Sequence, residues 1–428
     1  CGPEDNDALG KVLAKGTAVG ADRYSENYKI FQTLLTDFCG QTPFGANAFF
    51  YSLLLQVYIL PIIADSRDSA LMIFSTLNNR GLPLSDADIF KATLYNFQEG
   101  DEAKQKFAER WQVMTAAAHA AGSDLQRIFT YYMFYLRATE NDRDSTMPSL
   151  RKYYEAHNAK RLKANNLMDD LDRVIEVVGL LNKCGETPEW ADCPGILKSI
   201  DVLSYYPNEY GKYPVIVYCM KHCSGDGFKD NFALFLNKLI GELTIKAILS
   251  PGISAIKSSI LNLNCAICND ALPAIDFTRD ADMDELDKKL VDPHRDAVKM
   301  LLGILAYEES GQKKQLPARW EIEHILPRKW QATYFTENPE SVKNAIENIG
   351  NKIPLDKTHN MTASNGYFGK KRRNDYANSP IAIARRLAQL DQEDWKLEDI
   401  NRRNTEVIRQ LRAVFARWNA EYEKAASI

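Results

Sequence analysis

The chain has 428 residues, of which 45% are hydrophobic and 26% are charged, and its formal net charge at pH 7 is −4. This composition is typical of a soluble globular protein with two or three domains, and the charge excludes a surface coated uniformly for nucleic acid. No apolar run is long enough to cross a bilayer and no secretory signal is visible, so we expect a cytoplasmic protein without membrane contact.

The first 63 residues combine a polar start with two apolar segments. Residues 1–25 are polar and contain glycine, and we expect them to be loosely packed. Apolar residues recur at helical spacing between Tyr28 and Phe38, which predicts a helix. The segment 49–63 is the most apolar of the chain and predicts a buried strand or helix. Its core over 57–63 favours a strand broken by Pro61.

Residues 73–91 predict a helix, a tight turn and a second helix. Ser85 and Asp88 have the spacing of a capping box at the start of the second helix. The polar residues of this segment can alternatively bind a ligand or a phosphate: Asn78, Arg80, Asp86, Asp88 and Lys91. Spacing alone favours the first interpretation, a well-capped corner between two helices.

The region 101–315 is predicted to be mostly helical. Aromatic residues cluster at 129–135 and again at 205–218, where they can stack on bases but more commonly fill buried helix faces. Cys265 and Cys268 have metal-like spacing, and folding can bring further zinc ligands to them: Cys219, His222 and Cys223. Free buried thiols in a reducing cytoplasm are the alternative that we favour.

Residues 319–373 predict a strand, a connection, a second strand and a helix. Apolar and charged residues alternate from Arg319 to Ile325, as in a short strand, and the pattern returns at 349–355. Asp356 then follows, where it can cap a polar helix over 357–373.

The side chains of this segment suit phosphodiester hydrolysis. A neutral His324 can take a proton from water and so make it a nucleophile. Glu323 and Asn360 offer oxygen ligands for a hard divalent cation, Mg²⁺ or Mn²⁺. A basic run that can hold phosphate follows at the end of the predicted helix: Lys370, Lys371, Arg372 and Arg373.

The C-terminal region is more basic than the rest of the chain. Residues 316–428 contain 19 Lys and Arg and 15 Asp and Glu, a net charge of +4, which leaves −8 for the remainder. Two helices are predicted, over 380–390 and 397–418. The second carries five arginines, which either face DNA or form a solvated surface: Arg402, Arg403, Arg409, Arg412 and Arg417.

The order of these elements resembles the HNH, or ββα-metal, nuclease family. The resemblance implies that His324 is the general base, that Asn351 braces the loop after the first strand, and that Asn360 binds the metal. The acidic residue of the motif is Glu323 rather than the more usual aspartate. Three neighbours are further candidates for the metal position on the helix: His359, Ser364 and Asn365.

More narrowly, residues 323–371 resemble the C-terminal nuclease domain of GmrSD-type restriction endonucleases, which cleave modified phage DNA. Residues 74–88 resemble the end of the N-terminal domain of the same family. The Asp-Gly-Gln-Gln-Arg motif of that domain's ParB-like core does not occur in this sequence. The resemblance therefore implies a C-terminal fragment, for which we expect no bound nucleotide.

We thus expect a mainly α protein in three parts. These are the end of the family's N-terminal domain at 1–100, a helical middle region at 101–315, and an HNH-like nuclease domain with C-terminal helices at 316–428. The expected activity is metal-dependent cleavage of DNA that restricts foreign or modified phage DNA. The alternatives are an RNA nuclease or toxin-like enzyme, and a non-catalytic DNA-binding or assembly module with a relic HNH fold. Expected partners are DNA and either a second copy of the chain or the missing N-terminal half.

Overall fold

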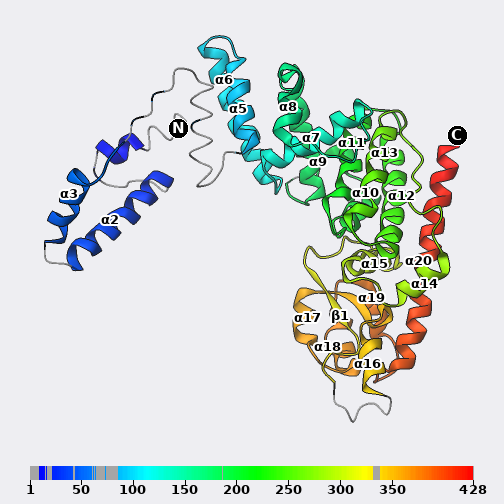
Figure 1. Cartoon of the computed structure of the whole chain (residues 1–428). Coiled ribbons are helices and arrows are strands. Elements are labelled where there is room, and N and C mark those ends of the chain that lie inside the picture. The colour runs from blue at the N-terminus through cyan, green and yellow to red at the C-terminus, as the bar shows by residue number, and fades with distance from the viewer. Residues whose placement is uncertain are drawn as a thin grey trace. The chain divides into compact units, whose positions relative to one another are not determined.

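The computed structural model describes residues 9–14, 16, 22–41, 44–59, 61, 63, 73, 85–185, 187–330 and 338–427. The chain divides into two compact units, Cys1–Pro83 and Leu84–Ile428. The described parts are mainly helical, and their strands form a two-stranded sheet (Figure 1). The mainly α class is therefore confirmed, and no described helix is both long and apolar enough to span a membrane.

The described residues of the first unit include the helices α2 (Arg23–Gln41) and α3 (Gly45–Leu55) and a helical segment at 9–14. Helix α2 confirms the helix predicted from Tyr28 to Phe38. Residues up to Leu55 are helical, which was one of the two structures predicted for 49–63. The strand favoured over 57–63 is wrong, because its described residues 57–59, 61 and 63 form no strand, and the predicted burial is wrong because residues 51–59 are exposed. An unbroken apolar run lacks the alternation that separates strands from helices, so its period could not decide between them. Most of residues 1–25, together with Asn78 and Arg80, lies outside the described residues.

The second unit begins with α5 (Asp86–Asn96), and its capping box is present. The Asp88 amide donates to Ser85 Oγ, and the Ser85 amide donates back to the Asp88 carboxylate, each over 3.2 Å. Asp86 accepts a hydrogen bond from Gln126 in a later helix. These contacts support a capped corner rather than a ligand site for the described part of this motif.

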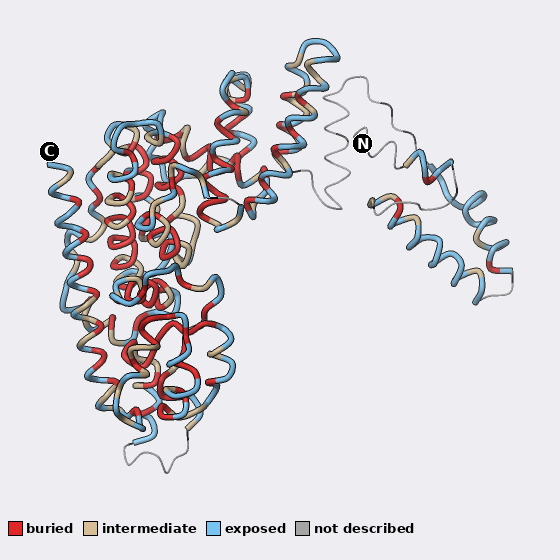
Figure 2. Tube along the Cα trace, turned by 180° about the vertical axis from the view of Figure 1, so that it is seen from behind, coloured by how far each residue is buried: buried red, intermediate tan, exposed pale blue. Residues whose placement is uncertain are grey.

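A helical body follows, as predicted. Its helices are α6 (Asp101–Ala120), α7 (Leu125–Thr139), α8 (Leu150–Ala159), α9 (Leu167–Leu181), α10 (Pro194–Leu203), α11 (Lys212–His222), α12 (Phe228–Leu249), α13 (Lys257–Ile267), α14 (Met283–Val291) and α15 (Arg295–Glu308). Figure 2 shows buried residues along the inward faces of these helices and exposed residues around them.

The aromatic clusters of the body are part of its core. Phe129 is fully buried, and Tyr131, Tyr132 and Phe134 are nearly so. Phe134 stacks on Tyr213 of α11 with ring centroids 3.6 Å apart. Rings that are packed against other helices have no free face for a base, so these clusters do not support base stacking.

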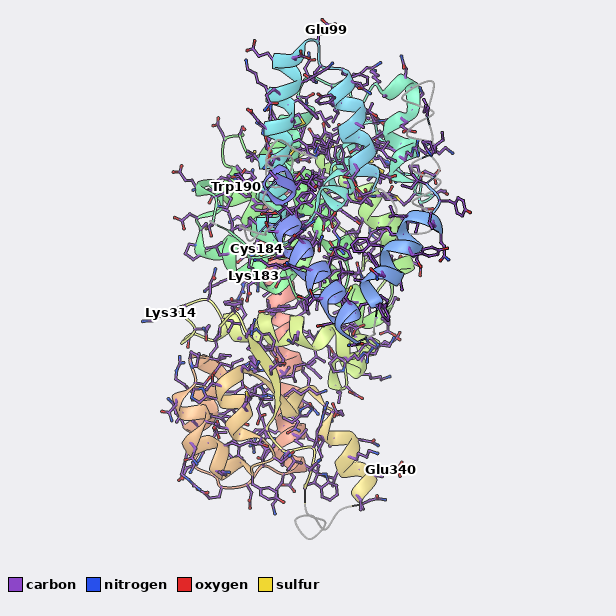
Figure 3. All side chains as sticks on the ribbon, turned by 90° about the vertical axis from the view of Figure 1, so that its left-hand side faces the viewer. Glu99, Lys183, Cys184, Trp190, Lys314 and Glu340 are labelled. Carbon is purple, nitrogen blue, oxygen red and sulfur yellow. The ribbon has the colours of Figure 1, made fainter. Side chains whose placement is uncertain are left out.

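The sheet and four short helices form the C-terminal region. They are β1 (Trp320–His324), α16 (Pro339–Ile346), β2 (Lys352–Asp356), α17 (Lys357–Ala363), α18 (Phe368–Asn374) and α19 (Ala382–Ala388). The strands are antiparallel, with His324 opposite Lys352 and Trp320 opposite Asp356. Helix α16 lies in the connection between the strands, and Figure 3 shows Glu340 projecting from its start.

Both predicted strands are confirmed, although the second begins at Lys352 because residues 349–351 form a 3₁₀ turn. The single helix predicted over 357–373 is wrong. The chain leaves the helix at Ser364, whose φ is 44° and ψ is −132°, and it resumes as α18 only at Phe368. Polar composition carried no period here, so it could not predict the break.

Helix α20 (Leu397–Ala426) joins the C-terminal region to the helical body. It contacts α12, α14 and α15 of the body, and also α16 and the 349–351 turn beside β2. Its 30 residues give it a length of about 45 Å, which is enough to run along both regions (Figure 1). The boundaries predicted at 100 and 315 stay predictions.

Gly350 makes the closest approach between α20 and the sheet. Its amide donates to Asn404 Oδ1 over 2.7 Å, and a Cβ at this position would overlap the Ile400 carbonyl oxygen and Asn404.

We expect Gly350→Ala to lower the free energy of unfolding by about 1–3 kcal/mol, because backbone atoms would have to move. Thermal denaturation measures this loss, with Gly195→Ala as the control at a position with ordinary space. Equal stability of the two variants would contradict the expectation.

Candidate active site

His324 is the last residue of β1, and contacts at both ends of that strand hold it in place. At the start of the strand, Trp320 Nε1 donates to the Tyr205 hydroxyl over 2.7 Å, and that hydroxyl in turn contacts Asp201. At the end, the Ile325 amide donates to the Asn351 carbonyl over 2.9 Å. The helical body and the second strand therefore both fix where the imidazole lies.

The imidazole of His324 is largely buried, with 11% of its side chain exposed. Its Nε2 lies 3.3 Å from Glu347 Oε2. Burial lowers the pKa of His324 to about 4, although the carboxylate of Glu347 opposes that shift. The ring is therefore neutral at pH 7 and can accept a proton.

Glu347 is held as a carboxylate by two cations. Arg328 Nε lies 2.9 Å from one of its oxygens, and Lys352 Nζ lies 3.1 Å from the other. Partial burial opposes ionisation, but these cations and His324 outweigh it and lower the pKa of Glu347 to about 2. Glu347 was not predicted from the sequence. It lies 23 residues after His324 in a different element, and no motif or period connects the two positions.

Asn351 is fully buried and spans the loop that follows His324. Its Oδ1 accepts a hydrogen bond from the Leu326 amide over 2.8 Å. Its Nδ2 donates to the carbonyls of Leu326 and Ile346, each over 3.0 Å. One amide side chain therefore ties the loop after β1 to the end of α16.

Glu323 lies on the opposite face of β1 from His324, since successive side chains of a strand alternate. It is buried, and its Oε1 lies 2.6 Å from Lys371 Nζ and accepts a hydrogen bond from the Tyr376 hydroxyl over 2.9 Å. Burial raises the pKa of Glu323, whereas the Lys371 ammonium favours the carboxylate. One oxygen of the carboxylate expected to hold a metal is thus occupied by two side chains of the protein.

Helix α17 begins with a different carboxylate and imidazole pair. Asp356 caps the helix by accepting from the His359 amide over 3.3 Å, as predicted, and it also lies 2.8 Å from His359 Nδ1. Its other oxygen accepts from Ser379 Oγ over 3.0 Å. The contact between the Asp356 carboxylate and His359 Nδ1 favours the tautomer with a proton on Nδ1, which leaves His359 Nε2 as an acceptor. Asn360 follows on the same helix, half-buried, and α17 contacts both strands.

The four basic residues after α17 have different surroundings. Lys370 is exposed, whereas Lys371 is 1% exposed and points beneath β1. Arg372 and Arg373 both pair with Glu393, over 2.8 Å and 2.6 Å. The run is therefore not a uniform basic surface, and Lys371 in particular does not reach the outside.

The arginines of α20 are also largely engaged. Arg403 is buried and donates to the carbonyls of Gly350 and Lys352, over 2.8 Å and 2.9 Å. Arg402, Arg412 and Arg417 pair with acidic residues. Arg403 is thus structural, and Arg402, Arg412 and Arg417 have their charges paired rather than forming a bare basic face.

Within the described ranges, no group of three or more His, Cys, Asp or Glu side chains is placed to hold a metal ion. Cys219, Cys265 and Cys268 are free thiols whose pKa is raised by burial, and His222 Nε2 lies 2.7 Å from the Ile267 carbonyl. This arrangement gives no support to a zinc site.

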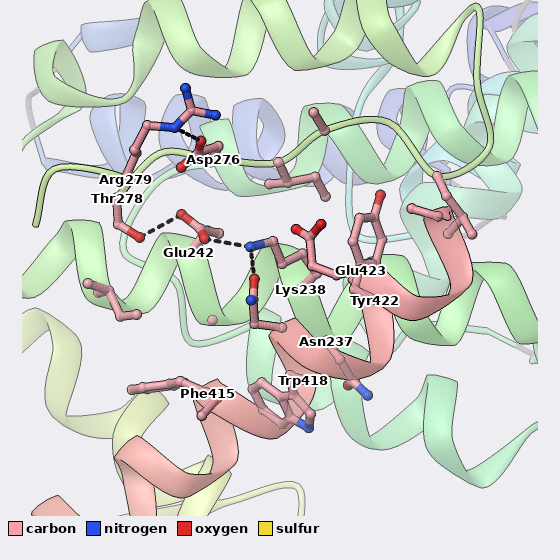
Figure 4. A pocket seen from close by; sticks show the side chains of 18 of the residues that line it. Asn237, Lys238, Glu242, Asp276, Thr278, Arg279, Phe415, Trp418, Tyr422 and Glu423 are labelled. Carbon is pink, nitrogen blue, oxygen red and sulfur yellow. Dashed lines mark hydrogen bonds and ion pairs between the residues drawn. The ribbon is translucent and has the colours of Figure 1, made fainter. Parts of the chain in front are cut away.

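A pocket of about 730 Å³ lies elsewhere, between α12, α20 and residues 272–283. Figure 4 shows its polar side chains turned toward one another. Lys238 pairs with Glu242 over 2.8 Å and contacts Asn419, and Glu242 accepts from Thr278 Oγ1 over 2.8 Å. Because these polar side chains bind one another, we interpret the pocket as a polar contact between helices and not as a second candidate site.

Residues 278–410, which include both strands, His324 and Asn360, match the family of GmrSD restriction endonucleases, C-terminal domain. The resemblance is confirmed for this region. The GmrSD-type match begins within the helical body, ahead of residue 316, and ends within α20. By its description, that family consists of restriction endonucleases. No match was found among curated proteins.

Proposed function

We propose that the C-terminal region is a metal-dependent DNA endonuclease of the HNH type, with β1, β2 and α17 as its ββα unit. The observation that carries this proposal is the state of His324. It is neutral at pH 7, held by Glu347 at the end of a braced strand, and 11% exposed. In this role it takes a proton from water as the oxygen attacks phosphorus.

The metal ligands that we propose differ from those predicted from the sequence at one position, Glu323. Asn360 offers an amide oxygen, the kind of ligand that fits a Mg²⁺ or Mn²⁺ ion that keeps most of its water. We propose His359, whose ring is backed by Asp356, as a nitrogen ligand beside it. When bound, such an ion would stabilise the charge that develops on the phosphate. Glu323 does not fit as a ligand, since it is buried against Lys371 and Tyr376.

Asn351 is assigned to bracing the loop after His324, which its three buried hydrogen bonds support. For phosphate binding we propose Lys370 and the accessible parts of Arg372 and Arg373. The burial of Lys371 removes the basis for a phosphate contact by that residue. The match to a family of restriction endonucleases supports a role in restriction, and we propose that the DNA cleaved is foreign or modified phage DNA.

The test is nicking of supercoiled plasmid by the chain in Mg²⁺, in Mn²⁺ and in excess chelator, beside matched single-stranded DNA and RNA. We expect cleavage of DNA that requires the metal. Preferential cleavage of RNA would favour the toxin-like alternative. DNA binding that weakens steeply with salt, without cleavage of modified or unmodified DNA, would favour a relic fold.

The pH dependence of nicking tests the protonation state of His324. A general base must be unprotonated, so a pKa lowered to about 4 keeps it active well below the ordinary histidine range. We expect kcat/KM to stay level from neutral pH down to about pH 5 and to fall only below that. Glu347→Gln removes a nearby anion and should move this fall to still lower pH. A fall centred near 6.5 that persists at saturating metal, where protonation of the proposed ligand His359 no longer limits metal binding, would mean that His324 is solvated in the active enzyme.

A further inference from the structure

Beneath β1, on the face opposite the His324 ring, lies a buried cluster of Glu323, Lys371 and Tyr376. The side chains of Lys371 and Glu323 are 1% and 6% exposed, and their charged atoms are 2.6 Å apart. The Tyr376 hydroxyl donates to the same carboxylate oxygen over 2.9 Å. Glu323 was predicted to bind a metal and Lys371 to contact phosphate. In the structure these two side chains pair with each other, and Tyr376 binds the same carboxylate.

The Lys371 ammonium also binds the backbone of the catalytic strand. It donates to the His324 carbonyl over 2.7 Å and lies 3.4 Å from the Ile325 carbonyl. An ammonium can donate three hydrogen bonds, and that of Lys371 has three acceptors nearby: the Glu323 carboxylate and the carbonyl oxygens of His324 and Ile325. The Lys371 side chain thus binds the backbone of His324, the proposed general base.

We infer that Lys371 is a positioning residue for His324 and that Glu323 serves as its buried counterion rather than as a metal ligand. The inference rests on the proposed nuclease function. Moving Glu323 to a divalent ion would leave the Lys371 ammonium buried without its carboxylate partner, and an unpaired buried charge is strongly unfavourable. A divalent ion would then be held by Asn360 and His359 of α17, while Lys371 fixes the end of β1.

A double-mutant cycle on the full chain tests the pair, with Glu323→Gln, Lys371→Met and the double variant. We expect Lys371→Met to lower Tm by about 4–7 °C, because the Glu323 carboxylate is left unpaired. The double variant should recover most of that loss, since both charges are gone. Matched controls are Glu321→Gln and Lys370→Met, exposed neighbours in sequence whose Tm should change little.

Binding of Mn²⁺, followed by electron paramagnetic resonance, separates the two roles of Glu323. We expect Glu323→Gln to bind Mn²⁺ as the unsubstituted chain does, and Lys371→Met to lose kcat in nicking while its Mn²⁺ affinity is unchanged. A tenfold or greater loss of Mn²⁺ affinity in Glu323→Gln would overturn the inference, as would additive changes in Tm. Failure of the proposed function looks different, because the unsubstituted chain would then neither bind Mn²⁺ nor nick DNA.

Discussion

Replacing His324 with alanine is expected to lower metal-dependent nicking of DNA by about 10²–10⁴-fold, the usual contribution of a positioned general base. The ring is neutral and its Nε2 faces the Glu347 carboxylate, which favours the proton on Nε2 and leaves Nδ1 as the acceptor that the substitution removes. The strand should survive, because its backbone is bound by Asn351 and Lys371 rather than by the imidazole. Single-turnover nicking at saturating Mn²⁺ measures the effect on the chemical step.

His119→Ala is the matched control, since His119 is exposed on α6 in the helical body. It should nick DNA as the unsubstituted chain does. Circular dichroism and Tm of both variants then distinguish a chemical loss from an unfolded protein. Cleavage that persists in His324→Ala would place the active site elsewhere in the chain.

Replacing Asn351 with alanine is expected to lower the free energy of unfolding by about 2–4 kcal/mol, because it leaves buried hydrogen-bonding groups without partners. The groups affected are the Leu326 amide and carbonyl and the Ile346 carbonyl. The loop after His324 would lose its tie to α16, so nicking should fall as well. Denaturant unfolding and nicking at a temperature where the variant remains folded measure the two effects separately.

Asn351→Asp provides a stricter test because its side chain has almost the same shape. The second carboxylate oxygen would face the Leu326 and Ile346 carbonyls, where Nδ2 now donates, so we expect this variant to be unstable too. Asn401→Ala, at an exposed position of α20, is the control. If Asn351→Asp were as stable as the unsubstituted chain, the orientation of the amide described above would be wrong.

Local patterns predicted much of the fold and pointed to His324 as the candidate base. Alternation predicted the strand that ends at His324, helical spacing predicted the body, and the position of Asp356 predicted a helix cap. These features depend on neighbours in the chain, so their signal lies in the sequence. The same reasoning failed at 49–63 and 357–373, where an unbroken apolar run and a polar run carried no period to read.

The sequence by itself determined which residue types the site contains and which elements carry them. Only the tertiary structure decided how those residues are paired. Glu347 meets His324 across 23 positions, and Lys371 reaches Glu323 and the His324 carbonyl from another helix. The physical reason is that a buried charge takes whichever partner packing places within a few ångströms, and the packing of separate elements leaves no period in the chain.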